Sequence, residues 1–170
     1  MGSQVGTDEE AFRQFVATRR PRLLRAAYLL TGDAGLAEDL VQTALFKTAL
    51  RWRRVAGSGD PEPYVRRILY TEHVSAWRRR RVPEVLGAQA PPGLTSAGDD
   101  PERRLLLREA LARLTPKQRA VLVLRYYEDL TETQAAAVLG CAPGTVKSQT
   151  RHALERLRAL APELAEEAKR

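Results

Sequence analysis

A break in composition between Val82 and Asp100 divides this chain into two parts. The segment reads VPEVLGAQAPPGLTSAGDD and is rich in Pro, Gly and Ala, with few periodic apolar residues. That composition is typical of a linker that is flexible apart from a short, stiff Pro-Pro step. Each flanking part is long enough for a small helical domain. The sequence therefore predicts two domains, residues 8–82 and 101–161, joined by a linker over residues 83–100.

Both domains are predicted to be all-α, because apolar residues recur at helical spacing and no window alternates with a period of two. The clearest amphipathic helix runs from Leu36 to Trp52, after a Thr31-Gly32-Asp33 segment that ends one helix and caps the next. Before it, Pro21 is expected to start a second helix, after a first one that begins near Phe12.

Capping residues mark the other helix boundaries. After a basic, glycine-containing loop over residues 53–59, Asp60-Pro61 is expected to start a helix that continues into the Arg78–Arg81 cluster. In the C-terminal domain, helices are expected to start at Asp100-Pro101 and at two threonines with the spacing of a capping box, Thr115 and Thr131.

The segment from Thr131 to Leu160 is the most specific motif. A short helix ends at Gly140, where a left-handed residue is needed, and a longer helix starts near Pro143. This is the pattern of a helix-turn-helix, whose second helix lies in the major groove of DNA. Lys, Arg and Gln can contact phosphates and base edges there. The candidate contacts are the polar residues on the faces not used for packing: Thr145, Lys147, Ser148, Gln149, Arg151 and His152.

A second basic cluster lies in the N-terminal domain, with aromatic residues interleaved in it. Arginines that follow a phosphate backbone, with rings available for unpaired bases, are what single-strand recognition requires. Trp52 is the exception, because we expect it to pack in the core. The cluster comprises Arg51, Arg53, Arg54, Arg66, Arg67 and Arg78–Arg81, with Tyr64, Tyr70 and Trp77 as aromatic neighbours.

Composition argues against several classes of protein. The net charge of +7 is compatible with a polyanionic partner, and equally with solubility alone. Cys141 is the lone cysteine, so neither an internal disulfide nor a zinc cluster is expected. His73 and His152 have no companion ligands and are expected at the surface or on DNA. With no signal peptide and no bilayer-length apolar run, we expect a cytoplasmic protein without membrane insertion, catalytic residues, metal or cofactor.

Two other function classes share part of this pattern. A transcription regulator that does not join RNA polymerase would have much the same helix-turn-helix. It would need a ligand pocket or a phosphoacceptor in the N-terminal half, and the sequence offers neither. A helical nuclease would need a convergent cluster of carboxylates or histidines for metal or acid–base chemistry, which the sequence also does not offer.

Three stretches resemble the extracytoplasmic-function (group 4) RNA polymerase sigma factors, and within them the SigE-like subgroup. LLTGDAGLAEDLVQTALFKTALRWRRV is similar to conserved regions 2.1–2.2 of that family, and PEPYVRRILYTEHVSAWRRRR to regions 2.3–2.4. LREALARLTPKQRAVLVLRYYEDLTETQAAAVLGCAPGTVKSQTRHALERLR is similar to regions 4.1–4.2. The resemblance implies a region 2 helical bundle and a region 4 helix-turn-helix, in a protein that binds core RNA polymerase and directs promoter-specific initiation.

The resemblance also implies a role for particular residues. In the family, a DLVQ stretch docks on the clamp helices of the polymerase β′ subunit, and it is matched here by Asp39, Leu40, Val41 and Gln42. From the residues alone, Asp39 and Gln42 would be a solvated helix face. Region 4 would lie on the β flap and its recognition helix on the −35 element of promoter DNA, and an anti-sigma factor is a candidate further partner. The residues implied at the −10 element are Arg53, Arg54, Arg66, Arg67, Thr71, Trp77, Arg78 and Arg79.

Two positions depart from the family pattern. Thr71 stands where many relatives have Asn, near the expected pocket for a flipped −10 base. Ala142 stands where many relatives have Ser at the cap of the recognition helix. Alanine cannot cap, which typically costs about 1 kcal/mol, and Pro143 in the first turn partly compensates.

Overall fold

The computed structural model describes residues 2–79 and 100–163, with side chains over 6–76 and 100–163. The predicted linker lies outside these ranges except for Asp100, as do Arg80 and Arg81. All regular elements within them are helices, which confirms the all-α prediction. The N-terminal unit comprises α1 (Gly2–Thr31), α2 (Ala34–Ala49), α3 (Trp52–Gly57) and α4 (Glu62–Arg79). The C-terminal unit comprises α5 (Pro101–Ala112), α6 (Pro116–Leu122), the π-helical segment η1 (Val123–Tyr127), α7 (Glu132–Leu139) and α8 (Pro143–Leu160).

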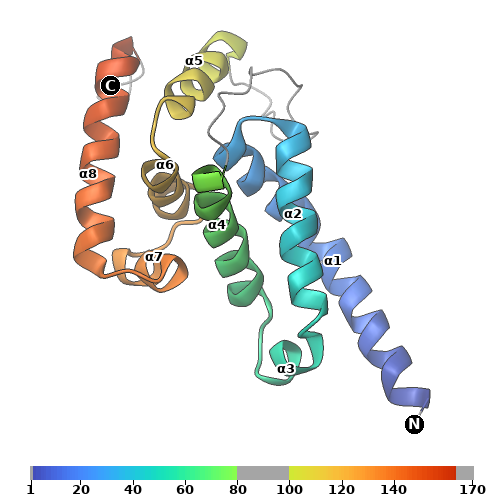
Figure 1. Cartoon of the computed structure of the whole chain (residues 1–170). Helices are drawn as coiled ribbons and strands as arrows, with labels where there is room; N and C mark the ends of the chain where they lie inside the picture. The colour runs from blue at the N-terminus through green and yellow to red at the C-terminus, as the bar shows by residue number, and fades with distance from the viewer. Residues whose placement is uncertain (1, 80–99, 164–170) are drawn as a thin grey trace.

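The turn between α1 and α2 has the predicted capping chemistry. Gly32 adopts a positive φ of 74°, and the backbone N–H of Leu36 donates to Asp33 Oδ1 at 2.8 Å. A left-handed glycine followed by an acidic cap reverses the chain within two residues. The two long helices therefore run side by side, and α4 packs against α2 (Figure 1).

Helix α1 is continuous through Pro21, so the prediction of a helix break there is wrong. Proline removes one backbone donor and crowds the preceding turn, which weakens a helix interior. Here the Pro21 side is exposed, while Phe15, Leu23 and Leu30 pack into one apolar core on either side of it. Burial of these side chains outweighs the loss of one hydrogen bond.

Trp52 begins α3 rather than ending α2, and part of the predicted loop over residues 53–59 is helical. Its ring is buried edge-on against Phe12, with centroids 5.0 Å apart, and lies 5.3 Å from the ring of Phe15. Aromatic pairs favour this edge-to-face geometry. The expectation that Trp52 packs in the core is confirmed, and the chain turns at Leu50 so that the indole can reach α1.

Both predicted capping boxes are present in the C-terminal unit. The N–H groups of Gln118 and Gln134 donate to the hydroxyls of Thr115 and Thr131, each at 3.2 Å, and the glutamine side chains accept from the threonine N–H groups. Gly140 ends α7 in the left-handed conformation, with φ of 66°. The N-terminus of α8 has no side-chain cap at Ala142, as expected.

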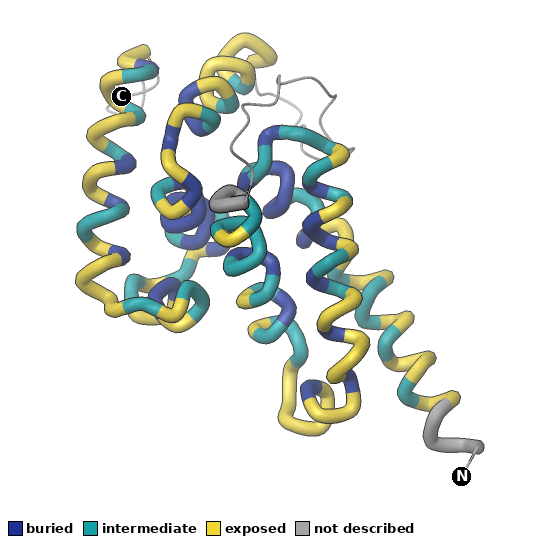
Figure 2. Tube along the Cα trace, viewed as in Figure 1, coloured by how far each residue is buried: buried dark blue, intermediate teal, exposed yellow. Residues whose placement is uncertain are grey.

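The two units pack against each other through α4. Helices α6 and α7 lie against α4 (Figure 1). The π-helical segment η1 lies against α1. Leu69 and Tyr70 of α4 share one buried apolar cluster with Val121 and Leu124 of the C-terminal unit. The buried segments of Figure 2 accordingly run through the middle of the molecule and across both units. The larger apolar core of the described parts thus extends across both units. A smaller, separate cluster lies within the C-terminal unit and comprises Leu111, Leu114, Leu122 and Ala153.

Two basic groups, one buried and one half-buried, lie at this junction. Arg119 of α6 donates from Nε to the carbonyl oxygen of Leu29 in α1, and burial lowers its pKa to about 10. His73 of α4 has a buried Nε2 without a hydrogen-bond partner among the described residues. Burial, and secondarily the charge of Arg119, lower the pKa of His73 to about 4. His73 is therefore half-buried, with its Nε2 turned inward, and is not fully at the surface as expected.

Replacing Gly140 by alanine should destabilise the protein by about 1 kcal/mol, because an L-residue is strained at positive φ. A Cβ at this position meets no atom within 4 Å, so the cost is conformational and not steric. Gly144 also has open space around it but does not have a positive φ, so Gly144→Ala is the matched control. Urea unfolding of the wild type and both variants measures the free energies of unfolding. A Gly140→Ala variant as stable as the wild type would contradict this prediction.

His73 should make stability fall as the pH drops from about 6.5 toward 4. The unfolded chain binds a proton on His73 near pH 6.5, while the folded chain does not until about 4. Between pH 7.5 and 5.0 the wild type should therefore lose about 2 kcal/mol more than His73→Asn. Urea titrations of both proteins at the two pH values measure this difference. The same loss in both proteins would show that His73 does not titrate as described.

Candidate nucleic-acid interface

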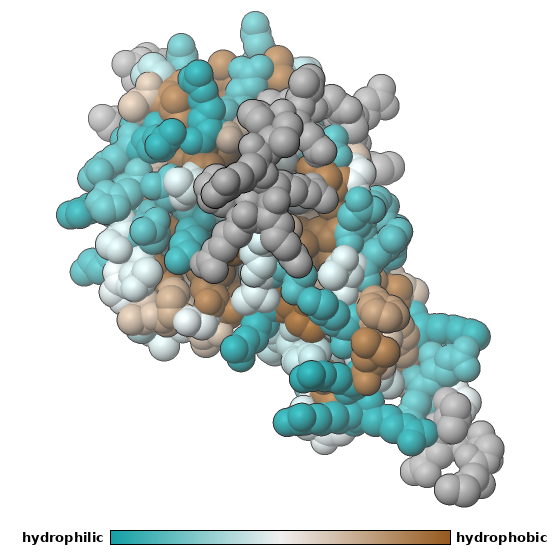
Figure 3. Space-filling view, viewed as in Figure 1, coloured by the Kyte–Doolittle hydropathy of each residue, from teal (hydrophilic) through white to brown (hydrophobic). Residues whose placement is uncertain are grey.

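The outer face of α8 carries the polar residues predicted to contact DNA. Val146, Thr150 and Ala153 are buried against the rest of the C-terminal unit. The predicted contacts lie on the remaining faces, four of them exposed and two half-buried, and hydrophilic side chains cover the outer edge of this helix in Figure 3. The exposed four are Thr145, Lys147, Arg151 and His152, and the half-buried two are Ser148 and Gln149.

Arg151 is an exposed cation on this face. Its side chain is 69% exposed, and its Nε lies 3.9 Å from Glu155 Oε1, at the limit of an ion pair. Its Nη2 lies 3.3 Å from His152 Nε2. Exposed pairs of this kind contribute little to stability. The guanidinium is therefore free to exchange Glu155 for a phosphate at small cost.

The four residues of the DLVQ stretch divide between two faces of α2. Asp39 and Gln42 are exposed, while Leu40 and Val41 are buried in the core. The line of exposed side chains continues along the helix with Phe46, which is 65% exposed, and reaches Leu50, which is 70% exposed. Hydrophobic atoms gather over this end of α2 in Figure 3. The helix thus presents a surface that is polar at one end and apolar at the other.

The predicted −10 residues line α3 and the outer side of α4. Arg53, Arg54 and Arg67 are exposed, and Arg53 Nε pairs with Asp8 Oδ2 of α1 at 2.7 Å. The hydroxyl of Thr71 donates back to the carbonyl oxygen of Arg67 at 2.7 Å, which leaves its oxygen able to accept. Trp77, Arg78 and Arg79 lie in the last turn of α4, and their side chains fall outside the described residues.

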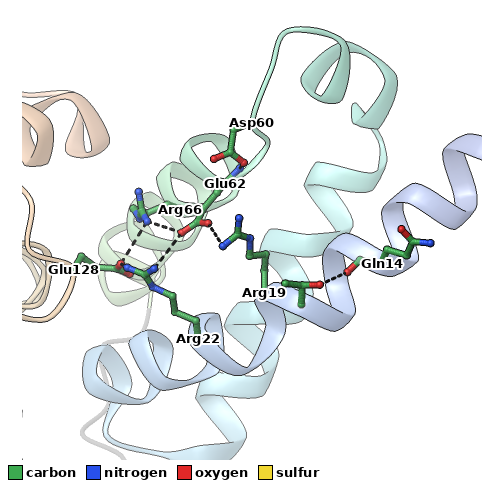
Figure 4. Close-up of polar contacts among 8 residues, drawn as sticks. Gln14, Arg19, Arg22, Asp60, Glu62, Arg66 and Glu128 are labelled. Atoms are coloured by element: carbon green, nitrogen blue, oxygen red, sulfur yellow. Dashed lines mark hydrogen bonds and ion pairs between the residues drawn. The ribbon is translucent and has the colours of Figure 1, made fainter.

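Arg66 differs from the other predicted −10 residues, because it is turned toward the C-terminal unit. Its side chain is only 15% exposed. Its Nη2 lies 2.7 Å from Glu62 Oε1 and 3.5 Å from Glu128 Oε2 (Figure 4). In this conformation both of the acids nearest to Arg66 occupy positions that a phosphate would need.

Glu128 at the end of η1 is the centre of this charge network and was not predicted from the sequence. Its side chain is 3% exposed and lies 2.9 Å from Arg22 Nη2, which donates to it. The Tyr70 hydroxyl donates to its other oxygen at 3.4 Å. The nearby Glu128 charge raises the pKa of Arg22, while burial and then Glu128 raise that of Tyr70 well above its usual range. Contacts over such sequence separations have no local signal in the sequence.

No group of three or more His, Cys, Asp or Glu residues in the described parts of the chain is arranged to hold a metal ion. In the same parts, no helix has both the length and the apolar character needed to cross a bilayer. Cys141 is free and half-buried, packed against the core beside the turn between α7 and α8. The chemistry that these surfaces offer is binding through charge, hydrogen bonds and apolar contact.

Two family descriptions match the chain. Sigma-70 region 2 matches residues 15–82, and Sigma-70 region 4 matches residues 104–157. The RNA polymerase sigma-E factor of Streptomyces avermitilis is 41% identical over 150 residues, covering 86% of this chain and 83% of that protein. The extracytoplasmic-function sigma factor SigL of Mycobacterium tuberculosis is 36% identical over 154 residues, covering 84% of each.

Solved structures have the same fold. The sigma factor RpoE of Bartonella quintana, in complex with the anti-sigma factor NepR, superposes with a TM-score of 0.70 at 26% identity, over 90% of this chain and 98% of that one. CnrH, in complex with the cytosolic domain of CnrY, superposes with a TM-score of 0.62 at 23% identity. By sequence and by fold, the chain belongs to the extracytoplasmic-function group of the sigma-70 family, and it is a sigma factor that directs promoter-specific initiation by RNA polymerase.

Proposed function

We propose that the N-terminal unit binds core polymerase and the −10 element while the C-terminal unit binds the −35 element. The observation that carries this assignment is that one chain bears two separate polar surfaces, on α2 and on α8, each exposed on the opposite side of its helix from the core. We assign residues 8–82 to the first domain, 83–100 to the linker and 101–161 to the second.

Polymerase docking falls to the exposed residues of α2. Asp39 and Gln42 contact the β′ clamp helices, and the buried Leu40 and Val41 fix the rotation of α2 so that those two side chains point outward. The C-terminal unit lies on the β flap, which orients α8 toward the −35 duplex. Docking of both units on one enzyme sets their separation along the promoter.

Base capture at the −10 element is the step that favours strand opening. The arginines of α3 and α4 follow the backbone of the unpaired strand, and we assign Thr71 and Trp77 to the base that is taken out of the stack. Unstacking costs a few kcal/mol, which contacts to the captured base offset. Thr71 offers one hydroxyl where an amide would offer both a carbonyl and an NH₂ group, so we expect altered base preference there.

The protein works in the cytoplasm and carries out no chemistry itself, since the polymerase supplies the active site. It needs no metal or cofactor for binding of this kind. A protein of the anti-sigma class is a further partner, proposed because the related RpoE is bound to the anti-sigma factor NepR. Run-off transcription with core polymerase on a library of genomic fragments tests the function directly. Start sites that appear only when the chain is added support it, and unchanged transcription would refute it.

Asp39→Ala should weaken binding to core polymerase by about tenfold or more, the loss typical of an important interface residue. Asp39 is exposed, so the fold should be unchanged. Glu38→Gln is the matched control, because the adjacent carboxylate pairs with Arg20 of α1 at 2.6 Å instead. Fluorescence titration with core enzyme measures both affinities. Wild-type affinity in Asp39→Ala would remove this residue from the docking surface.

Arg151→Ala should weaken binding of the −35 duplex and lower the slope of log K against log salt by about 1, as expected for one lost phosphate contact. Arg158→Ala is the control, since Arg158 is exposed on the same helix two turns further on. Anisotropy titrations of holoenzyme at several salt concentrations give the slopes. Equal slopes in wild type and Arg151→Ala would exclude a phosphate contact.

A further inference from the structure

Glu128 joins the two units by charge. Within the described parts of the chain, three side chains contact its carboxylate: Arg22 of α1, and Arg66 and Tyr70 of α4, all from the N-terminal unit. Figure 4 shows the two arginines. The carboxylate is 3% exposed, so water is almost absent from it. Buried charges persist in proteins only where opposite charges or hydrogen-bond donors surround them. Glu128 makes these contacts only while the two units are packed together. It therefore favours the packed arrangement over one in which the units separate and these partners are lost.

The local backbone aims Glu128 at the other unit. Its N–H donates to the carbonyl of Val123, five residues back, which closes the π-helical turn. Asp129 follows with φ of 55°, a left-handed conformation that is uncommon for a residue other than glycine. Single π turns occur often at functional positions. Two unusual features in succession thus determine where one carboxylate points.

A compact chain cannot reach both promoter elements. Elements about 25 base pairs apart are separated by about 85 Å along B-form DNA. A compact protein of this length has a radius of gyration of about 15 Å, and hence a diameter of about 40 Å. The stretch of chain from Arg79 to Asp100 spans at most about 75 Å when fully extended. On the proposed function, on which this inference rests, the two units must separate and break every contact to Glu128.

We propose that Glu128 holds the free protein closed by occupying, on Arg22 and Arg66, the anion site that a DNA phosphate takes when the units separate. Carboxylate and phosphate both accept paired hydrogen bonds from a guanidinium. In the closed form Arg66 is shared between Glu62 of its own helix, at 2.7 Å, and Glu128, at 3.5 Å. In the open form it loses Glu128 and is available to DNA. The free protein binds nucleic acid weakly because the Glu128 carboxylate competes with DNA phosphates for Arg22 and Arg66.

The experiment follows the separation of the units in the full chain. Spin labels are placed at two exposed alanines, Ala17 of α1 and Ala159 of α8, as Ala17→Cys and Ala159→Cys with Cys141→Ser. Double electron–electron resonance gives the distance distribution. Glu128→Gln keeps the shape of the side chain and removes its charge, and Arg22→Gln removes a partner from the other unit. Glu109→Gln, an exposed acid on α5, is the matched control.

The wild type and Glu109→Gln should show one short distance. Glu128→Gln and Arg22→Gln should shift the population toward longer distances, with the ratio of open to closed form rising about tenfold, or about 1.4 kcal/mol. Circular dichroism checks that both variants remain helical. If the folded variants keep the distance distribution of the wild type, Glu128 does not hold the chain closed.

Competition with phosphate is measured in the same proteins with a fluorescent oligo(dT) of about 12 nucleotides, a length that one single-strand site covers. Glu128→Gln should bind it more tightly than the wild type by about the factor by which the open form increases. Arg22→Gln should gain less, because it also loses one cation of the site. If Glu128→Gln opens but binds the oligonucleotide with the affinity of the wild type, Glu128 does not compete with phosphate for these arginines. Failure of the run-off assay would contradict the sigma function without changing the distance result.

Discussion

The packing of the C-terminal unit on α4 is the interaction on which the rest of this structure depends. Leu69 and Tyr70 share a core with Val121 and Leu124, and that apolar contact brings charged groups into the junction with them. Because charges at such a junction lose water, each needs a partner. Glu128 finds Arg22 and Arg66, Arg119 finds a backbone carbonyl, and His73 is left neutral by its low pKa.

Local features of the fold could be predicted from the sequence, and long-range ones could not. The capping residues Asp33, Thr115, Thr131 and Gly140 act within four residues, so their chemistry is visible in the chain itself. Pro21 does not start a new helix, because the core on either side of it outweighs its local preference. Trp52 packs in the core as expected but begins α3 and does not end α2. Contacts such as Arg22 to Glu128, 106 positions apart, and Arg119 to Leu29, 90 apart, leave no local trace. The resemblance supplied the function, which helix patterns alone left open between a regulator and a sigma factor.

The candidate surfaces differ in how ready they are for their partners. The outward-facing predicted residues of α8 and α2, such as Arg151, Asp39 and Gln42, are exposed, and the ion pair of Arg151 is long and solvent-exposed, so binding costs little rearrangement. On α4, Arg66 is engaged by acids of its own chain, and Arg53 pairs with Asp8. Two arginines of the predicted −10 surface, Arg53 and Arg66, are thus restrained by ion pairs within the chain. This arrangement links DNA binding to the separation of the two units, because separation removes Glu128 from Arg66 and leaves that arginine available to DNA.

The distance between α1 and α8, measured in the free chain and again with core polymerase and a promoter fragment, tests this account most directly. A single short distance in the free protein, replaced by one tens of ångströms longer in the complex, is the result expected if the units separate to span the promoter. A distance that stays the same when polymerase and DNA are bound would contradict it, because the closed form cannot reach both elements.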